Sequence, residues 1–161
     1  MSIPSEAIRL IHQGKGYSVS GVLTIAGGAS YTFVGVPDAL HVHFHDMRVD
    51  ASAGPVGIDF TESPTVNDYG TKSAAMNRRR DIINPARMGL YMGATISGGL
   101  TLFNTRIHGV TTGQGRGGEG IVSGEWDLDP GKIYAVRITN LTSPAESVTV
   151  SVDMQFYEDE L

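Results

Sequence analysis

The chain contains no cysteine among its 161 residues. A disulfide framework, a thiolate zinc site and a cysteine nucleophile are therefore excluded together. A chain of this length can still bury roughly two-thirds of the surface that its unfolded form exposes. We therefore expect one domain whose hydrophobic core forms without covalent or metal cross-links.

Long apolar runs are also missing. No stretch approaches the ~20 apolar residues that cross a bilayer, and residues 1–6 lack the basic and apolar segments of a secretory signal. We expect a protein that is made and kept in a soluble compartment, without a membrane partner.

Positive charge is scarce as well. Lys and Arg number 12 against 17 Asp and Glu, which gives a formal net charge of -5 and a pI near 5.4. Nucleic-acid-binding domains usually carry a basic excess, so we expect no nucleic-acid partner. Only 18% of residues are charged while 21 are glycine, which indicates many turns and a surface that partners partly cover.

Helical periodicity is nearly absent, and period-two alternation takes its place. Near the end of the chain, apolar residues alternate with polar ones and predict a strand with one solvated face; these apolar residues are Val148, Val150, Val152, Met154 and Phe156. A similar alternation over residues 134–139 predicts a strand adjacent to it. Between Asp129 and Lys132, proline and glycine stand where a type II turn needs them.

Earlier strands are predicted over short segments bounded by Gly, Pro, Ser or Asp; these are residues 17–25, 31–36, 40–49, 56–60, 88–92 and 100–107, with 126–128 extended. Such spacing is typical of a sandwich or barrel. Two stretches, 63–86 and 109–124, are predicted as long loops, which tend to be functional or disordered.

Residues 1–16 are predicted to form an N-terminal arm, with one or two helical turns over 6–12, and residues 17–161 the β-sandwich domain. Two alternatives stay open for the arm. It becomes ordered against a neighbouring subunit, or its helix docks on its own sandwich.

Three histidines alternate with apolar residues over 40–45, so His41, His43 and His45 share one face of a predicted strand. Neighbours at i and i+2 lie ~6.7 Å apart, so two of them can share one Zn²⁺ but three cannot. A second strand would have to complete the site with His108 or Glu62, as in the metal-binding jelly rolls called cupins. The alternatives are a solvated polar face, which is our first interpretation, and a ring of histidines around a symmetry axis. We predict no metal and no other cofactor.

Two further patterns resemble known kinds of binding or catalytic site. Residues 113–118 match the dinucleotide pattern GxGxxG, but no βαβ unit surrounds them, so we interpret them as a surface loop. Glu125, Asp127 and Asp129 share one face of an extended segment and could hold Ca²⁺ or serve a glycosidase, although a solvated face is the simpler interpretation.

The basic cluster Asn77, Arg78, Arg79 and Arg80 is a candidate interaction site. It suits carboxylates of a neighbouring protein, or phosphates. In an acidic chain, a single basic cluster favours a protein partner. A solvated loop tip is the alternative.

The order of several features resembles the head decoration (cement) proteins of tailed bacteriophages. The resemblance spans residues 30–156 and lies in Gly70-Thr71, Asn77-Arg78, a glycine-rich loop, the segment 125–130, Tyr134 and Thr139-Asn140. It implies a single jelly-roll-like β-sandwich, assembled as a homotrimer that clamps adjacent major capsid proteins on the virion surface. It also implies a core with Trp126, Leu128 and Tyr134, a turn at Pro130-Gly131, and an intersubunit contact at Asn77 and Arg78.

The resemblance implies no catalytic residues, so we predict a non-enzymatic virion protein made in the host cytoplasm. Two other functions stay open. One is a phage tail or spike component or carbohydrate-binding jelly roll, although such sites usually expose aromatic platforms and the chain has one tryptophan. The more remote one is a cupin-like metalloprotein.

Overall fold

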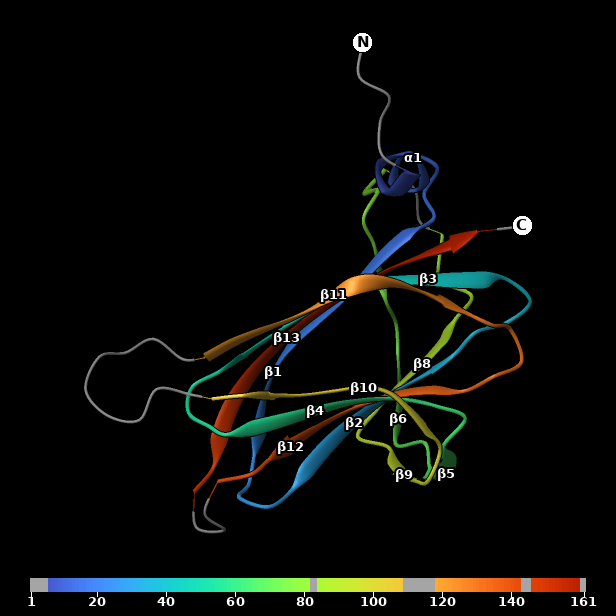
Figure 1. The fold of residues 1–161 in the computed structure, drawn as a ribbon. Helices are drawn as coiled ribbons and strands as arrows, with labels where there is room; N and C mark the ends of the chain where they lie inside the picture. The colour runs from blue at the N-terminus through green and yellow to red at the C-terminus, as the bar shows by residue number, and fades with distance from the viewer. Residues whose placement is uncertain (1–5, 82–83, 109–117, 143–145, 160–161) are drawn as a thin grey trace.

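The computed structural model describes residues 6–81, 84–108, 118–142 and 146–159, and folds them into two facing antiparallel sheets with one short helix on top (Figure 1). The elements in chain order are α1 (Glu6–His12), β1 (Gly16–Ile25), β2 (Ser30–Val36), β3 (His41–Ala51), β4 (Val56–Glu62), β5 (Thr65–Asp68), β6 (Thr71–Ser73), β7 (Met76–Asn77), β8 (Gly89–Met92), β9 (Thr95–Ser97), β10 (Leu100–Ile107), β11 (Gly118–Leu128), β12 (Tyr134–Asn140) and β13 (Val148–Asp159).

The strand order is that of a jelly roll. Sheet A has the order β11-β3-β13-β1-β7, and sheet B has the order β10-β4-β12-β2-β8-β6. The chain passes from one sheet to the other at most connections: β1 lies in sheet A, β2 in B, β3 in A and β4 in B, and after β10 the alternation resumes with β11, β12 and β13. The predicted all-β, jelly-roll-like sandwich is confirmed.

The prediction that the last two strands are adjacent is wrong. β12 pairs with β2 and β4 in sheet B, whereas β13 pairs with β1 and β3 in sheet A. Alternation identifies a strand with one buried face, but it does not identify the hydrogen-bonded neighbour. In this topology, β12 and β13 face each other across the core.

The loop predicted over 63–86 is also partly wrong, because it contains β5, β6 and β7. These strands belong to an insertion between β4 and β10. Its strands β8 and β6 extend sheet B beyond β2, and β7 extends sheet A beyond β1. The second predicted loop, 109–124, ends earlier than expected, since β11 begins at Gly118; residues 109–117 lie outside the described residues.

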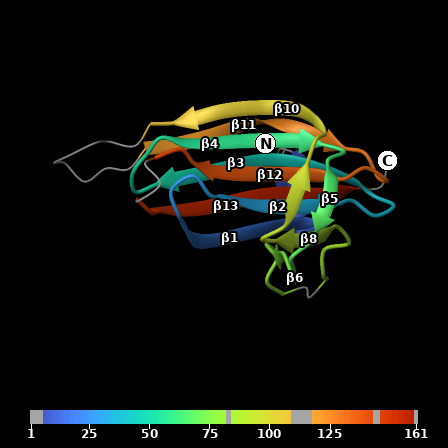
Figure 2. The same ribbon diagram turned by 90° about the horizontal axis from the view of Figure 1, so that it is seen from below.

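The β5–β9 pair crosses the outer face of sheet B near one end of the sandwich (Figure 2). It covers Val34 and Ala135, which point away from the main core, and adds Ala94 to a small second apolar cluster. The insertion therefore buries apolar surface that a plain jelly roll would expose, which is favourable by about 25 cal/mol per Å².

The main core fills the space between the sheets with apolar side chains from both. Phe60 lies at its aromatic centre, with ring centroids 5.5 Å from Phe44, 5.6 Å from Trp126 and 6.1 Å from Tyr134. Leu128 and Tyr134 are buried as expected, and Trp126 is half-buried against the same cluster. The turn at Pro130-Gly131 is confirmed, because Gly131 has a φ of 88° and the Lys132 amide donates to the Asp129 carbonyl at 3.4 Å.

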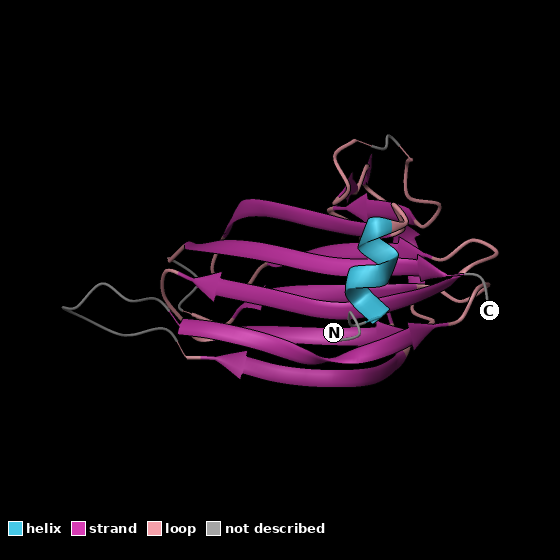
Figure 3. Ribbon diagram, turned by 90° about the horizontal axis from the view of Figure 1, so that it is seen from above, coloured by secondary structure: helices cyan, strands magenta, loops and turns pink. Residues whose placement is uncertain are grey.

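The helix predicted in the N-terminal arm is present as α1 and lies across the outer face of sheet A (Figure 3). Leu10 is 2% exposed, and Gly16 on β1 approaches Ile11 so closely that an added Cβ would lie 2.7 Å from its side chain. From Glu6 onward, the arm therefore docks on its own sandwich. Within the described part of the chain, no helix has the length and hydropathy needed to span a bilayer.

Candidate functional site

The three histidine side chains of β3 lie on the outer face of sheet A. On β3, Val42 and Phe44 are buried in the core, whereas His41 and His43 are partly exposed. His45 continues this alternation on the same side, and the bulge changes the phase only after it: β13 pairs Phe156 with Phe44 and Gln155 with Asp46, so His45 is the extra residue between them. The predicted shared face of the three histidines is thus correct.

Each histidine has a partner on a neighbouring strand. The Nδ1 of His41 lies 3.0 Å from Asp127 Oδ1, and that of His43 lies 3.6 Å from Glu125 Oε1. The ring of His45 meets Tyr157 edge-on, with centroids 5.5 Å apart. Two of the three carboxylates that the sequence predicted on one face of an extended segment thus pair with the histidines.

These pairs do not add up to a metal centre. Among the described residues, no group of three or more His, Asp or Glu side chains is arranged to hold a metal ion. His108 follows β10 at the opposite end of the sandwich from His41, and Glu62 lies in sheet B, where it pairs with Lys132 at 3.1 Å. A cupin-like site would also need the histidines between the sheets, where Val42 and Phe44 lie instead.

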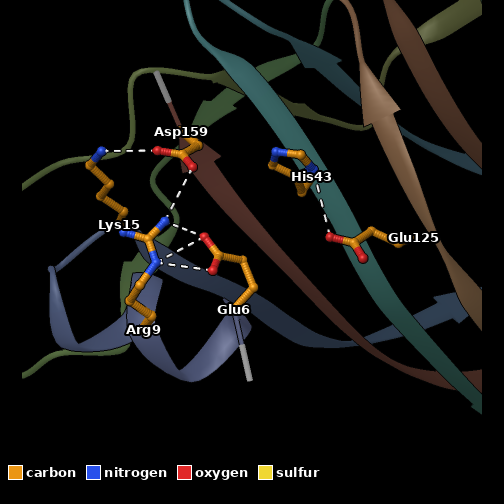
Figure 4. Close-up of polar contacts among 6 residues, drawn as sticks. All are labelled: Glu6, Arg9, Lys15, His43, Glu125 and Asp159. Atoms are coloured by element: carbon orange, nitrogen blue, oxygen red, sulfur yellow. Dashed lines mark hydrogen bonds and ion pairs between the residues drawn. The ribbon is translucent and has the colours of Figure 1, made fainter. Parts of the chain in front are cut away.

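A network of charged side chains fixes α1 near His43 (Figure 4). Arg9 pairs with Glu6 within the helix and with Asp159 at 3.6 Å, and Lys15 also reaches Asp159 at 3.1 Å. The hydrogen bond from Arg9 holds the pKa of Glu6 below its ordinary value and raises that of Arg9. The network is exposed, so its pairs are individually weak, and it orients the helix more than it stabilises the fold.

The third acidic residue of the β11 run belongs to the turn that follows. Asp129 pairs with Lys132 at 3.0 Å, and Lys132 also reaches Glu62. Hydrogen bonds to Asp129 and then to Glu62 raise the pKa of Lys132. The hydroxyl of Tyr134 accepts from the Asp129 amide at 3.0 Å, and burial raises the pKa of this tyrosine. The carboxylates thus serve the turn and the strand pairing.

The predicted basic interaction cluster makes contacts within its own chain. Asn77 is buried, and its side-chain amide donates to the carbonyls of Gly14 at 2.8 Å and Asn84 at 3.1 Å, while its Oδ1 accepts from the Arg79 amide. Asn77 therefore joins the insertion to the junction of α1 and β1.

The three arginines extend this junction. Arg78 donates to Gln155 at 2.9 Å, Arg79 pairs with Asp81 at 2.9 Å and also donates to the His12 carbonyl, and Arg80 lies 3.4 Å from the Asn77 carbonyl. Arg78 and Arg80 are nevertheless exposed. The sequence identified the cluster but not its internal role, because its partners lie far away along the chain.

The sequence missed a buried acid in the same region. Glu158 is 3% exposed, and its Oε1 accepts a hydrogen bond from the Met88 amide at 2.7 Å. A signal for it exists, since Glu158 continues the inward phase of the alternation that ends with Met154 and Phe156. This carboxylate ties the C-terminal strand to the insertion.

Sheet B carries a shallow polar hollow that the sequence also did not identify. Its side chains include Asp59, Asn104, Arg106, Arg137 and Thr139 from three neighbouring strands. Asp59 accepts from Arg137 at 3.2 Å and from Asn104. The outer face of sheet A has a comparable hollow around Val22, which is 70% exposed and is surrounded by small or polar residues such as Ser20 and Ser151.

The interior offers little room for a ligand. The cavity between the sheets has a volume of about 40 Å³ and an apolar lining that includes Phe44, Phe60 and Met154. Pockets for small molecules and cofactors measure roughly 300–1,000 Å³. Recognition by this jelly roll is therefore expected on its outer surfaces.

Comparisons with known proteins leave the family open. No family model matches the sequence, and no curated protein matches it. Among solved structures, the VP2 subviral particle of infectious bursal disease virus aligns with 90% of this chain at 11% identity and a TM-score of 0.23, and this chain spans 42% of that one. At that score the likeness carries no argument about fold or function.

Proposed function

We propose that the chain is a virion structural protein, a decoration or cement subunit that binds the major capsid protein lattice of a tailed bacteriophage head. It acts as a homotrimer on the capsid surface, without catalytic activity or cofactor, after synthesis in the host cytoplasm. One observation carries the proposal: the jelly roll implied by the sequence resemblance is present, and its own side chains fill the interior.

The outer face of sheet A is the surface proposed to contact the lattice. Val22 is exposed in the shallow hollow on this face, which is lined by hydroxyl side chains of β1 and β13 and by the charged Arg48, Asp50 and Asp153. Covering an exposed apolar side chain on binding is favourable by about 25 cal/mol per Å² of apolar surface. Three copies of a modest contact would give a trimer strong attachment through avidity.

The basic segment contributes at the margin of this surface. Asn77 is buried and stabilises the segment, whereas the exposed guanidinium groups of Arg78 and Arg80 are available to carboxylates of a neighbouring subunit. The proposed interaction site therefore consists of Arg78 and Arg80, without Asn77.

The first experiment is native mass spectrometry of the purified protein, as isolated and after treatment with a chelator. We expect a metal-free trimer near three times 17.1 kDa. A monomer that carries one transition-metal ion would overturn the proposal and direct attention to His41 and His43.

The second experiment is co-sedimentation with capsids of the encoding phage that were assembled without this protein. Wild type should bind, and Val22→Glu should bind at least tenfold more weakly while it remains a trimer. The matched control is Thr95→Glu, an exposed position on the other side of the sandwich, which should bind like wild type. Failure of the wild-type trimer to bind would contradict the proposal.

A carbohydrate-binding spike or tail module is the second candidate, and one observation favours it. Tyr69 is 39% exposed, and its ring packs at a tilt of 55° against that of Tyr91, with centroids 4.8 Å apart, which gives a small aromatic surface beside Asp68 and Lys72. This function would be favoured over the first if the protein does not bind capsids but binds host surface polysaccharide, and if Tyr69→Ala abolishes that binding.

A further inference from the structure

Several strand edges of the sandwich have no partner among the described residues. In sheet B, β10 pairs with β4 on one side, and no other described strand pairs with its opposite side. In sheet A, β11 also pairs on one side only among the described strands, and at the far edge β7 covers only Tyr17 and Ser18 of β1. Of the two open strands β10 and β11, which lie at the same rim of the sandwich (Figure 2), β11 carries three acidic residues, whereas β10 carries a single charge.

The open strand β10 has few charged residues, as is typical of a strand that is paired on both sides. Leu100 is 62% exposed, Leu102 and Phe103 are only partly buried, and Arg106 is the one charged residue of the eight. Edge strands that stay solvated usually carry Lys, Pro or several charges, which prevent pairing with another chain. Here a bulge between Thr101 and Phe103 is the only such protection. A second strand on this edge would satisfy the open backbone groups and cover the apolar side chains.

We propose that β10 pairs antiparallel with β10 of a second copy of this chain, about a two-fold axis near Asn104. An antiparallel edge is its own complement under two-fold symmetry, and the residue at the axis is uncharged. The two Arg106 residues would lie roughly 14 Å apart along the strands, beyond the Debye length of about 8–10 Å at physiological salt.

The contact is small, so it should form in concentrated solution or within an assembly. Interfaces below about 1,200 Å² are typically weak or transient. In dilute solution the protein would keep the oligomeric state set by its other surfaces. As the concentration rises, β10 pairing would join two such oligomers and double the number of subunits.

Single-cysteine cross-linking tests the geometry, because the wild-type chain has no cysteine of its own. Under mild oxidation, Asn104→Cys should form a disulfide-linked dimer in high yield. Leu100→Cys, on the same strand but away from the axis, and Thr71→Cys, exposed on the opposite edge of sheet B, should yield at least fivefold less. Equal yields at the three positions would overturn the proposal.

Sedimentation across a concentration series tests the pairing without a cross-link. Wild type should double in mass, and Asn104→Lys, which places two like charges at the axis, should not; Thr71→Lys is the matched control. If the protein is a trimer whose mass at high concentration is the same in wild type and in both variants, β10 pairing is overturned and the decoration function is left intact. If the mass doubles in wild type and Thr71→Lys but not in Asn104→Lys, β10 pairing is upheld. If the same protein does not bind capsids, the proposed function is contradicted.

Discussion

The side-chain amide of Asn77 donates a hydrogen bond of 2.8 Å to the carbonyl of Gly14, 63 residues earlier in the chain. The same amide group donates to the Asn84 carbonyl, and the side-chain Oδ1 of Asn77 accepts from the Arg79 backbone amide. One buried side chain thus holds together the end of α1, the start of β1 and the insertion. Asn77 therefore stabilises the fold, although the basic residues that follow it suggest an interaction site.

Asn77→Asp should destabilise the protein more than Asn77→Ala. Alanine leaves buried carbonyl groups without a donor, at a cost of about 1–3 kcal/mol, whereas a carboxylate would in addition face those carbonyl oxygens with negative charge. Urea unfolding monitored by Trp126 fluorescence measures both. Asn67→Ala, at an exposed position, is the control and should change the midpoint little; equal stability of the two Asn77 variants would contradict this account.

Glu158 should be replaceable by glutamine but not by alanine. Glu158→Gln keeps an oxygen that accepts from the Met88 amide, while Glu158→Ala leaves that buried N–H unpaired and opens a cavity. We expect Glu158→Ala to lose about 2–4 kcal/mol and Glu158→Gln less than half of that, as measured by chemical denaturation. A larger loss in the glutamine variant would mean that the negative charge itself is needed.

Gly131→Ala should destabilise the fold through the backbone alone. Gly131 has a φ of 88°, and an added Cβ would meet no atom within 4 Å, so the expected cost of about 1–2 kcal/mol is that of a left-handed L-residue. Gly21→Ala is a matched control, because its Cβ would also meet nothing and its φ is not positive. Thermal melts should give a lower Tm only for Gly131→Ala; a similar drop in both would contradict the explanation.

Stability should fall above pH 10, in part through Tyr134. Burial raises the pKa of its phenol above the ordinary value of 10.0, so the unfolded chain loses this proton first as the pH rises. Between the two pKa values the unfolded state is therefore favoured, and folding stability decreases. Tyr134→Phe should lose less stability than wild type between pH 10 and pH 11 in urea titrations, although its stability at pH 8 is lower. Parallel losses in the two proteins would contradict a contribution from Tyr134.

The sequence by itself determined the class of the fold and most of its strands. Period-two alternation depends only on which side chains enter the core, so β1, β2, β3, β4, β8, β10, β12 and β13 could be predicted near their observed bounds. The turn at Pro130-Gly131 was equally accessible, because its geometry follows from two residue types. The shared face of His41, His43 and His45 followed from the same periodicity.

Only the tertiary structure decided which strands pair and what the candidate residues contact. β12 and β13 are close in sequence yet lie in different sheets, because jelly-roll connections cross the core and pairing depends on partners remote in the chain. The partners of His43 and Asn77 lie 82 and 63 residues away, on β11 and before β1. No local pattern encodes such distances, since these contacts form only when the burial of two separate apolar faces brings the sheets together.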